Sequence, residues 1–386
     1  MGDVNTIVRR AAAALALVVG VAGSTGCVPM WDEPPPADFY DLPSGGEGAD
    51  EPAGTLERVQ RVTSTRFPDA DVYRVAYWTT DRIDRPQVAT GIVSVPRAAA
   101  PAGGRPFIAY THGTTGMAPQ CAPSRAGDGF LPAEYVRSGL PVVAPDYIGL
   151  GPVGKRHSYL SGVSEARATI DLVRAAADLP RAGHDGSWYV IGHSQGGHAA
   201  LFTGEEAPSY APELDLKGVV AGAPPTGQMS DPAVLGTPVQ IAFIMALVGM
   251  AEDHPGLVPE DYFSPAVEER LGVLDTGCLN DIVLSMIQVP GSAIDVPIDQ
   301  RLTDAMVGTT PGHRPIGVPI HVFQGDRDPI VWPQATRDYV AAACARGEVV
   351  EYAEYPTDHN SIGAASAAVT RWLLTVESGA AAPTTC

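Results

Sequence analysis

The sequence predicts an α/β fold in which a mostly parallel β-sheet is covered by helices on both faces. Three observations lead to this prediction. Apolar runs with the length of buried strands alternate with helical segments through much of the chain. One of these runs leads directly into a glycine-rich turn and a helix, and one long segment lacks the alternation and is expected to be an insertion. With 386 residues, the chain is long enough for one large domain with insertions or for two ordinary domains.

The N-terminal segment is expected to be an export signal and not part of the fold. Two arginines precede the apolar stretch 11–23, which has the form of a signal sequence and is too short to span a bilayer comfortably. We therefore predict an export signal over residues 1–27 and a secreted or extracytoplasmic protein. Cys27 ends a segment of small residues that resembles the sites at which bacterial lipoproteins are cut and lipidated. Cys27 is thus a candidate lipid anchor, and we expect no other attachment to a membrane.

Residues 28–55 are predicted to be a disordered linker, because Pro, Gly and acidic residues dominate them and aliphatic side chains are few. The folded domain is then expected over residues 56–376. Its first elements are two β-rich runs at 72–79 and 88–95, which are separated by aspartates and a proline. This pattern predicts an antiparallel pair of strands.

The alternating part of the chain contains five further runs of buried-strand character. They are residues 106–110, 141–144, 188–191, 218–221 and 319–323. The clearest helix is expected from Ser164 to Leu179, because apolar residues recur there near the helical period. Ser164 is expected to cap the start of this helix, and Pro180 to end it.

The strand-like run 188–191 ends in Gly-His-Ser-Gln-Gly at residues 192–196, which has the G-x-S-x-G form of a nucleophile elbow. In such an elbow the serine is strained, and only very small residues fit on either side of it. Gly192 and Gly196 occupy these two positions. The following alanine-rich stretch is expected to open a helix whose free N–H groups face the serine. We predict that Ser194 is a nucleophile; the alternative is an ordinary glycine-rich connection.

Residues 225–314 form the segment without alternation, and it is too long for a plain loop. It contains the apolar runs 239–248 and 282–287. We predict a mainly helical cap over the site around Ser194, with an apolar wall for an acyl chain. The alternative is that these apolar side chains form only the core of the cap itself.

A serine hydroxyl needs a histidine as base, and the histidine needs an acid to orient it. In a fold with this elbow the acid and then the histidine follow the serine. Asp328 lies in the loop after the predicted strand 319–323 and is preferred to Asp326 because it directly precedes Pro-Ile-Val; the alternative is that both aspartates only cap a helix. Of the nine histidines, His359 alone combines a position after the acid with a loop that follows a strand-like run, at 349–353.

Acyl transfer also needs two donors for the oxyanion that develops on the carbonyl group. The backbone N–H of Gln195, the residue after the nucleophile, is one expected donor. The other should come from the loop H-G-T-T-G at residues 112–116, which follows an early strand. Thr114 is our choice within the span 113–116.

Charge and cysteine content limit the partners and cofactors. The formal net charge is −19, which argues against nucleic acid and anionic membrane surfaces as partners and favours a neutral substrate. Cys121, Cys278, Cys344 and Cys386 allow three disulfide pairings, which the spacing does not distinguish. No two of them have the short spacing typical of a zinc site, so we expect no metal.

Several motifs together carry a resemblance to a known family. They are the elbow, H-G-T-T-G at 112–116, C-A-P-S at 121–124, P-D-Y at 145–147 and G-x-x-D at 325–328. Over residues 60–375 the chain resembles the secretory lipase family of α/β-hydrolases, of the lipase-A type, although the H-G-T-T-G loop differs from the usual pattern there. The resemblance implies an α/β-hydrolase fold with a helical cap and the catalytic residues Ser194, Asp328 and His359. It also implies the disulfides Cys121–Cys278 and Cys344–Cys386, the second of which would tie down the C-terminal tail 377–386.

The expected function is that of a secreted serine hydrolase, a lipase or esterase, which cleaves ester or lipid substrates through an acyl-enzyme on Ser194. We expect a monomer that needs no metal or organic cofactor. A serine peptidase or an acyltransferase would use the same three residues, so the motifs leave these alternatives open. A binding protein without catalysis is disfavoured, because every catalytic role has a well-placed candidate.

Overall fold

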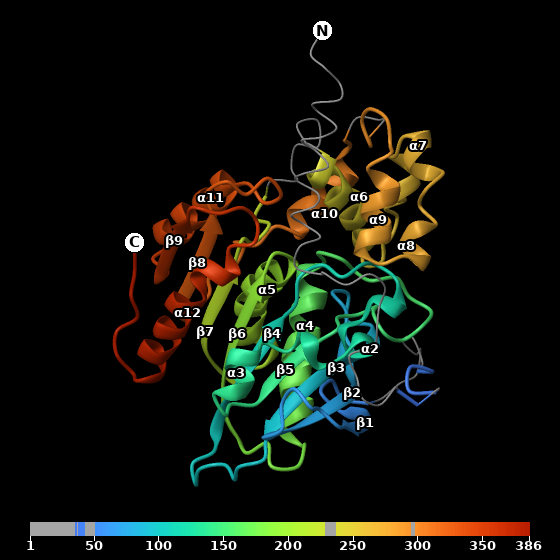
Figure 1. The fold of residues 1–386 in the computed structure, drawn as a ribbon. Helices are drawn as coiled ribbons and strands as arrows, with labels where there is room; N and C mark the ends of the chain where they lie inside the picture. The colour runs from blue at the N-terminus through green and yellow to red at the C-terminus, as the bar shows by residue number, and fades with distance from the viewer. Residues whose placement is uncertain (1–34, 37, 43–50, 228–236, 295–297) are drawn as a thin grey trace.

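The computed structural model describes residues 35–36, 38–42, 51–227, 237–294 and 298–386. The predicted export signal and its candidate anchor Cys27 lie outside the described residues. Figure 1 shows a central sheet with helices on both of its faces, and a group of further helices at one end of the sheet.

Nine strands form the sheet. Their bounds are β1 (Leu56–Val62), β2 (Ala70–Thr80), β3 (Pro86–Pro96), β4 (Arg105–Thr111), β5 (Val142–Pro145), β6 (His184–His193), β7 (Asp215–Gly222), β8 (Ile320–Gly325) and β9 (Val350–Tyr355). The strand order is β1-β2-β3-β5-β4-β6-β7-β8-β9. The pairings from β1 to β5 are antiparallel, and all pairings from β5 to β9 are parallel. Both the predicted antiparallel pair and the mostly parallel sheet are therefore confirmed.

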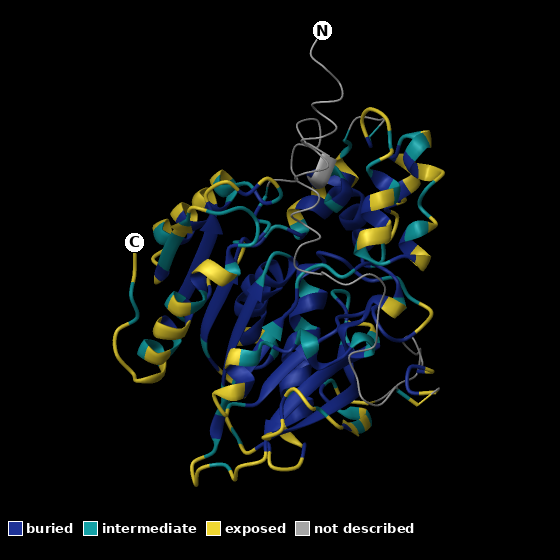
Figure 2. Ribbon diagram, in the orientation of Figure 1, coloured by how far each residue is buried: buried dark blue, intermediate teal, exposed yellow. Residues whose placement is uncertain are grey.

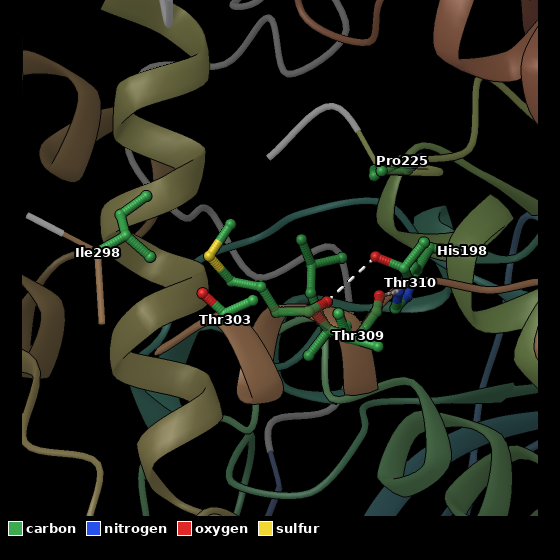
Figure 3. A pocket seen from close by; sticks show the side chains of 10 residues that line it. His198, Pro225, Ile298, Thr303, Thr309 and Thr310 are labelled. Atoms are coloured by element: carbon green, nitrogen blue, oxygen red, sulfur yellow. Dashed lines mark hydrogen bonds between the residues drawn. The ribbon is translucent and has the colours of Figure 1, made fainter. Parts of the chain in front are cut away.

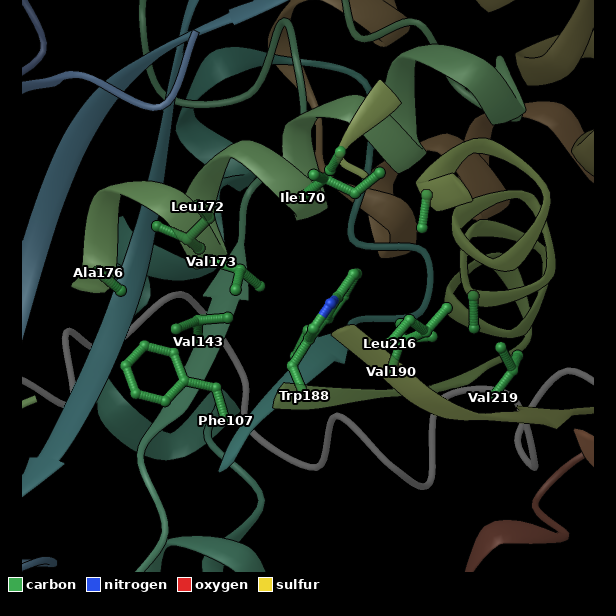
Figure 4. Packing of buried hydrophobic residues seen from close by; sticks show 14 of the residues in the cluster. Phe107, Val143, Ile170, Leu172, Val173, Ala176, Trp188, Val190, Leu216 and Val219 are labelled. Carbon is green, nitrogen blue, oxygen red and sulfur yellow. The ribbon is translucent and has the colours of Figure 1, made fainter. Parts of the chain in front are cut away.

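Helices cover the two faces of the sheet. Their bounds are α4 (Gly162–Ala177), α5 (Gln195–Tyr210) and α11 (Pro333–Ala345) on one face, and α3 (Ala133–Arg137) and α12 (Ile362–Glu377) on the other. Because successive side chains of a strand point to opposite faces, Val190 packs with the first group and Ile191 with the second. Figure 4 shows the first core, in which Trp188 lies between Phe107 and Leu216. In Figure 2 the inner strands of the sheet are largely buried, whereas the edge strands β1 and β9 are only partly buried.

The helix α4 differs from its prediction at both ends. It begins at Gly162 and ends at Ala177, so that Ser164 lies inside its first turn and not at its N-cap. The hydroxyl of Ser164 instead donates a hydrogen bond to Asp253 at 2.6 Å. Asp253 follows α6 (Thr237–Ala251), so this serine connects α4 with the inserted segment.

The inserted segment is mainly helical, as predicted. After α6 come the 3₁₀ turn η5 (Pro259–Asp261) and the helices α7 (Pro265–Glu268), α8 (Val273–Thr276), α9 (Leu279–Met286) and α10 (Gln300–Gly308). These elements share an apolar core separate from the two cores of the sheet. In helix α6, residues 243–250 are all buried and belong for the most part to this core, so the apolar run forms the interior of the cap, as the alternative expectation stated. We call residues 237–294 and 298–310 the cap.

Part of the predicted linker is ordered, which differs from the expectation for residues 28–55. Phe39, Tyr40 and Leu42 are buried against the domain. The hydroxyl of Tyr40 is 2.8 Å from that of Ser124, and the guanidinium of Arg125 lies 3.7 Å from the centre of the Tyr40 ring. Two adjacent aromatic side chains supply apolar area and a cation–π contact that the polar composition of the segment does not indicate.

Two disulfides join distant parts of the chain. Cys121 is bonded to Cys278, which connects the loop after β4 with the cap, and Cys344 is bonded to Cys386, which ties the C-terminus to α11. This is the pairing that the family resemblance implies. No helix in the described ranges combines the length and the apolar character needed to cross a membrane.

The remaining short elements lie between β4 and β5. They are the 3₁₀ turns η1 (Pro119–Cys121) and η2 (Asp128–Phe130) and the helix α2 (Pro123–Ala126).

Candidate active site

Ser194 lies at a tight turn between β6 and α5. Its backbone angles are φ 59° and ψ −125°, a conformation that L-residues rarely adopt and that stores strain. A Cβ atom at Gly196 would lie 1.9 Å from the carbonyl oxygen of Thr111, and one at Gly192 would lie 2.0 Å from that of Gly196. Both positions therefore exclude any side chain. The turn has the geometry that the G-x-S-x-G pattern predicts.

Ser194, His359 and Asp328 form a hydrogen-bonded line. The Oγ of Ser194 is 2.9 Å from Nε2 of His359, and Nδ1 of His359 is 2.7 Å from Oδ2 of Asp328. The three residues follow β6, β9 and β8, respectively. Because parallel strands end at the same edge of the sheet, their loops meet there. The imidazole is largely buried, with 15% of its side chain exposed, and the carboxylate is fully buried.

The carboxylate of Asp328 accepts four hydrogen bonds. Its Oδ1 accepts from the backbone N–H groups of Ile330 and Val331, and its Oδ2 accepts from Nε2 of Gln324 as well as from His359. These bonds hold the carboxylate in one orientation. Asp326, the candidate that the sequence disfavours, is exposed and pairs with its neighbour Arg327.

The side chain of Gln324 is a part of the site that the sequence did not reveal. Besides its bond to Asp328, its Oε1 accepts a hydrogen bond from the hydroxyl of Thr336 at 2.9 Å. Gln324 is fully buried near the end of β8. A glutamine within a buried strand was the one available signal, since a buried amide needs partners.

His193 precedes the serine but does not contact its hydroxyl. Its ring packs beside that of His359, with 4.9 Å between the ring centres, and its Nε2 is 3.4 Å from the hydroxyl of Ser361. Burial, followed by the nearby His359, lowers the pKa of His193 to about 3. His193 is therefore neutral at physiological pH and supports the neighbouring imidazole by packing.

The loop after β4 passes close to Ser194. A Cβ atom at Gly113 would lie 3.9 Å from Cβ of Ser194. Thr114, the next residue, has its hydroxyl 2.9 Å from that of Tyr159. On the other side of the serine, Gln195 is the first residue of α5, so its backbone N–H has no partner within the helix. Gln195 therefore follows the nucleophile directly, and Thr114 follows Gly113, whose backbone lies beside the nucleophile.

A buried polar network lies behind the turn. The side-chain nitrogen of Gln195 is 2.7 Å from Oε1 of Glu165 and 2.8 Å from Nε2 of His157. The other oxygen of Glu165 is 3.2 Å from Nδ1 of His198, whose Nε2 is 2.8 Å from the carbonyl oxygen of Thr309 in the cap. The sequence did not indicate this network, because its members are spread over four separate segments.

A pocket lies between α5 and α10, with about 530 Å³ of empty space that is partly open to solvent (Figure 3). Its lining comprises Leu160, His198, Pro225, Gly227, Ile298, Thr303, Met306, Val307, Thr309 and Thr310. Neither Ser194 nor His359 belongs to this lining, but His198 lies one helical turn after Ser194. The lining is mostly apolar, and helix α5 links the pocket to the turn at Ser194. Among the described residues, no group of three or more His, Cys, Asp or Glu side chains is arranged to hold a metal ion.

Comparisons with known proteins agree with this geometry. A family model described as secretory lipase matches residues 127–379, which is more than half of the chain. A secreted triacylglycerol lipase of Malassezia globosa is 25% identical over 382 residues, and the match covers 91% of this chain and 80% of that protein.

Two solved structures extend the comparison to the fold. Lipase A of Candida antarctica is similar with a TM-score of 0.73 and 19% identity, covering 90% of this chain and 87% of the other. The rice cell wall degrading esterase LipA of Xanthomonas oryzae is similar with a TM-score of 0.64 and 21% identity, covering 85% of this chain and 96% of the other. At these identities the likeness concerns the fold alone, and it confirms the predicted α/β-hydrolase architecture.

Proposed function

Because the chain belongs to the secretory lipase family, we propose that it is an exported serine hydrolase that cleaves carboxylic esters through an acyl-enzyme on Ser194. The single observation that carries this proposal is the line of two hydrogen bonds from Ser194 through His359 to Asp328. Nucleophile, base and orienting acid are the three parts that hydroxyl-based acyl transfer requires.

The proposed reaction begins with attack of the Ser194 oxygen on the ester carbonyl. Nε2 of His359 takes the hydroxyl proton, while Asp328 accepts the hydrogen bond from Nδ1 and stabilises the imidazolium. The protonated imidazole then gives its proton to the departing alcohol, which leaves an acyl-enzyme. Water attacks the acyl-enzyme with His359 as base, and the carboxylic acid is released.

The negative charge on the carbonyl oxygen needs donors that are in place before the reaction. We assign this role to the backbone N–H of Gln195 and to Thr114. The opening turn of α5 adds the favourable field of a helix N-terminus. Two features support the assignment. Gln195 directly follows the nucleophile, and the Gly113 backbone passes beside Ser194.

Support for an ester as substrate comes from the family and from the pocket. The Malassezia globosa relative is named a triacylglycerol lipase. The pocket between α5 and α10 offers apolar side chains, among them Leu160, Ile298 and Met306, for the hydrocarbon part of an ester. A peptidase or acyltransferase activity has no specific observation in its favour.

Hydrolysis of p-nitrophenyl esters from acetate to palmitate tests the proposal, with the parent protein and the variant Ser194→Ala. We expect the variant to lose hydrolysis by a factor on the order of 10⁶ in kcat, as when the nucleophile of other serine hydrolases is removed. Equal rates for the two proteins would refute the role of Ser194. A fluorophosphonate probe should label Ser194 in the parent only, and peptide substrates should remain uncleaved.

The location of the protein is also part of the proposal. The family is described as secretory lipase, and the Malassezia globosa relative is named a secreted lipase. We propose that this chain is exported through residues 1–27 and acts outside the cytoplasm as a monomer. Mass spectrometry of the mature N-terminus tests the export signal and decides whether Cys27 carries a lipid.

A further inference from the structure

Two side chains of the loop between β5 and α4 contact the side chains of Gln195 and Thr114, the two residues that we propose as oxyanion donors. Nε2 of His157 is 2.8 Å from the amide nitrogen of Gln195, and the hydroxyl of Tyr159 is 2.9 Å from that of Thr114. His157 is completely buried, and Tyr159 is 5% exposed. Two residues that are two positions apart thus reach two donors that are 81 positions apart in the sequence (195 − 114).

We propose that His157 and Tyr159 are positioning residues of the oxyanion hole, which hold Gln195 and Thr114 in the geometry that the transition state requires. This inference rests on the proposed function. It adds two residues that no sequence motif indicated and that act through their neighbours without touching the substrate.

The contact between His157 and Gln195 has a defined direction. Nδ1 of His157 donates to the carbonyl oxygen of Ile148 at 2.9 Å, so Nε2 carries no proton and accepts from Gln195. Burial lowers the pKa of His157 to about 3, which keeps the ring neutral and the acceptor in place. The second amide hydrogen of Gln195 goes to Glu165. With both hydrogens bonded, the side chain of Gln195 is fixed at the start of α5.

The contact between Tyr159 and Thr114 leaves a hydrogen for the substrate. Thr114 is the partner of the Tyr159 hydroxyl among the described residues, so donation from tyrosine to threonine is the arrangement that satisfies the buried O–H group. Burial raises the pKa of Tyr159, which keeps this donor protonated. The hydroxyl of Thr114 then keeps its own hydrogen for another acceptor. The same bond also holds the backbone of Thr114 beside the turn.

The loop itself is held rigidly. The backbone N–H of His157 donates to Met117, and that of Leu160 donates to the carboxylate of Glu165. The His157 ring stacks on Tyr147, and the Tyr159 ring packs in the core of the cap. A residue can position a catalytic group only if it is itself fixed, and both residues meet this condition.

The expected kinetic effect is a loss of kcat with little change in KM, because an oxyanion hole binds the transition state more strongly than the substrate. Removing a donor itself lowers kcat by about 10² to 10³, and misplacing one should have a smaller effect. We expect Tyr159→Phe to lower kcat about tenfold, with KM changed by less than about twofold. His157→Phe should act in the same way, and His157→Gln, whose amide oxygen can accept, should recover part of the loss.

The experiment compares these variants with Tyr77→Phe as the matched control. Tyr77 is also a buried tyrosine, and its hydroxyl donates to the backbone of Ala168 at 2.7 Å, away from the site. An aliphatic trifluoromethyl ketone, which forms a tetrahedral adduct with a serine nucleophile, supplies the second readout. Its affinity should fall with Tyr159→Phe by the same factor as kcat/KM, and should be unchanged in Tyr77→Phe.

Parental kcat and inhibitor affinity in Tyr159→Phe would overturn the inference, as would an equal loss in Tyr77→Phe. Thermal unfolding of each variant identifies losses that come from the fold and not from the site. A parent protein without hydrolysis that depends on Ser194 would instead contradict the proposed function, and the inference with it.

Discussion

Replacing Asp328 by asparagine tests the catalytic line by changing one atom. If the new NH₂ group takes the place of Oδ2, it faces two donors, Nε2 of Gln324 and Nδ1 of His359. If it takes the place of Oδ1, it faces the backbone N–H groups of Ile330 and Val331, which have no other protonation state. The first arrangement is therefore favoured, because histidine can move its proton.

An NH₂ group in the place of Oδ2 forces His359 into the wrong tautomer. Nδ1 of His359 then accepts from the asparagine, and its proton moves to Nε2, which faces the hydroxyl of Ser194. A protonated Nε2 cannot take the serine proton. The imidazolium also loses the carboxylate charge. We expect kcat to fall by about 10⁴, which corresponds to about 5.5 kcal/mol of transition-state stabilisation.

The assay is hydrolysis of a short p-nitrophenyl ester together with thermal unfolding, and Asp326→Asn is the matched control. Asp326 lies two positions away and its side chain is 41% exposed, so its amide should leave kcat within about twofold of the parent. Retention of more than about a tenth of the parental kcat by Asp328→Asn would refute the assignment of the acid. So would an equal loss in the control variant.

Two further predictions concern the backbone at the turn and the buried histidines. Gly196→Ala would place a Cβ atom 1.9 Å from the backbone of β4. We expect this variant to lose about 1 to 3 kcal/mol in stability and at least about 10²-fold in kcat. The control Gly103→Ala, whose Cβ atom would have no other atom within 4 Å, should change neither quantity. Calorimetry and ester hydrolysis measure both effects, and a stable, fully active Gly196→Ala would contradict the close packing. Burial lowers the pKa of His112 to about 4 and those of His157 and His193 to about 3, against about 6.5 in the unfolded chain. Below about pH 6.5 the unfolded chain protonates these histidines and the folded chain does not. Their contribution to stability should therefore be constant above that pH, and each histidine should lower the stability by up to about 1.4 kcal/mol per pH unit as the pH drops towards 4. Urea unfolding of the parent and of His193→Phe between about pH 5 and 7 isolates the contribution of one ring, and the same slope in both proteins would argue against a neutral buried His193.

Local patterns were enough to predict the fold class and the candidates for the catalytic line. The G-x-S-x-G turn depends on two glycines next to the serine, and the structure shows why, since neither position has room for a Cβ atom. Serine, acid and histidine come together because each lies in a loop after one of the parallel strands, which end at the same edge of the sheet. Asp328 and His359 are therefore readable as loop residues after strands, and their catalytic roles stay predictions until activity is measured.

Contacts between distant segments were decided by the tertiary structure alone. Gln324, Glu165, His157 and Tyr159 look like ordinary residues of a strand, a helix and a loop, yet each bonds to a residue of the candidate site. The same holds for Ser164. The helix pattern predicted it as the N-cap residue of α4, but its hydroxyl bonds to Asp253 in the inserted segment. Periodicity and turn chemistry act over a few residues, so they are visible in the sequence. A hydrogen bond across 165 positions, such as that between His359 and Ser194, forms only because the order of the strands brings its partners together.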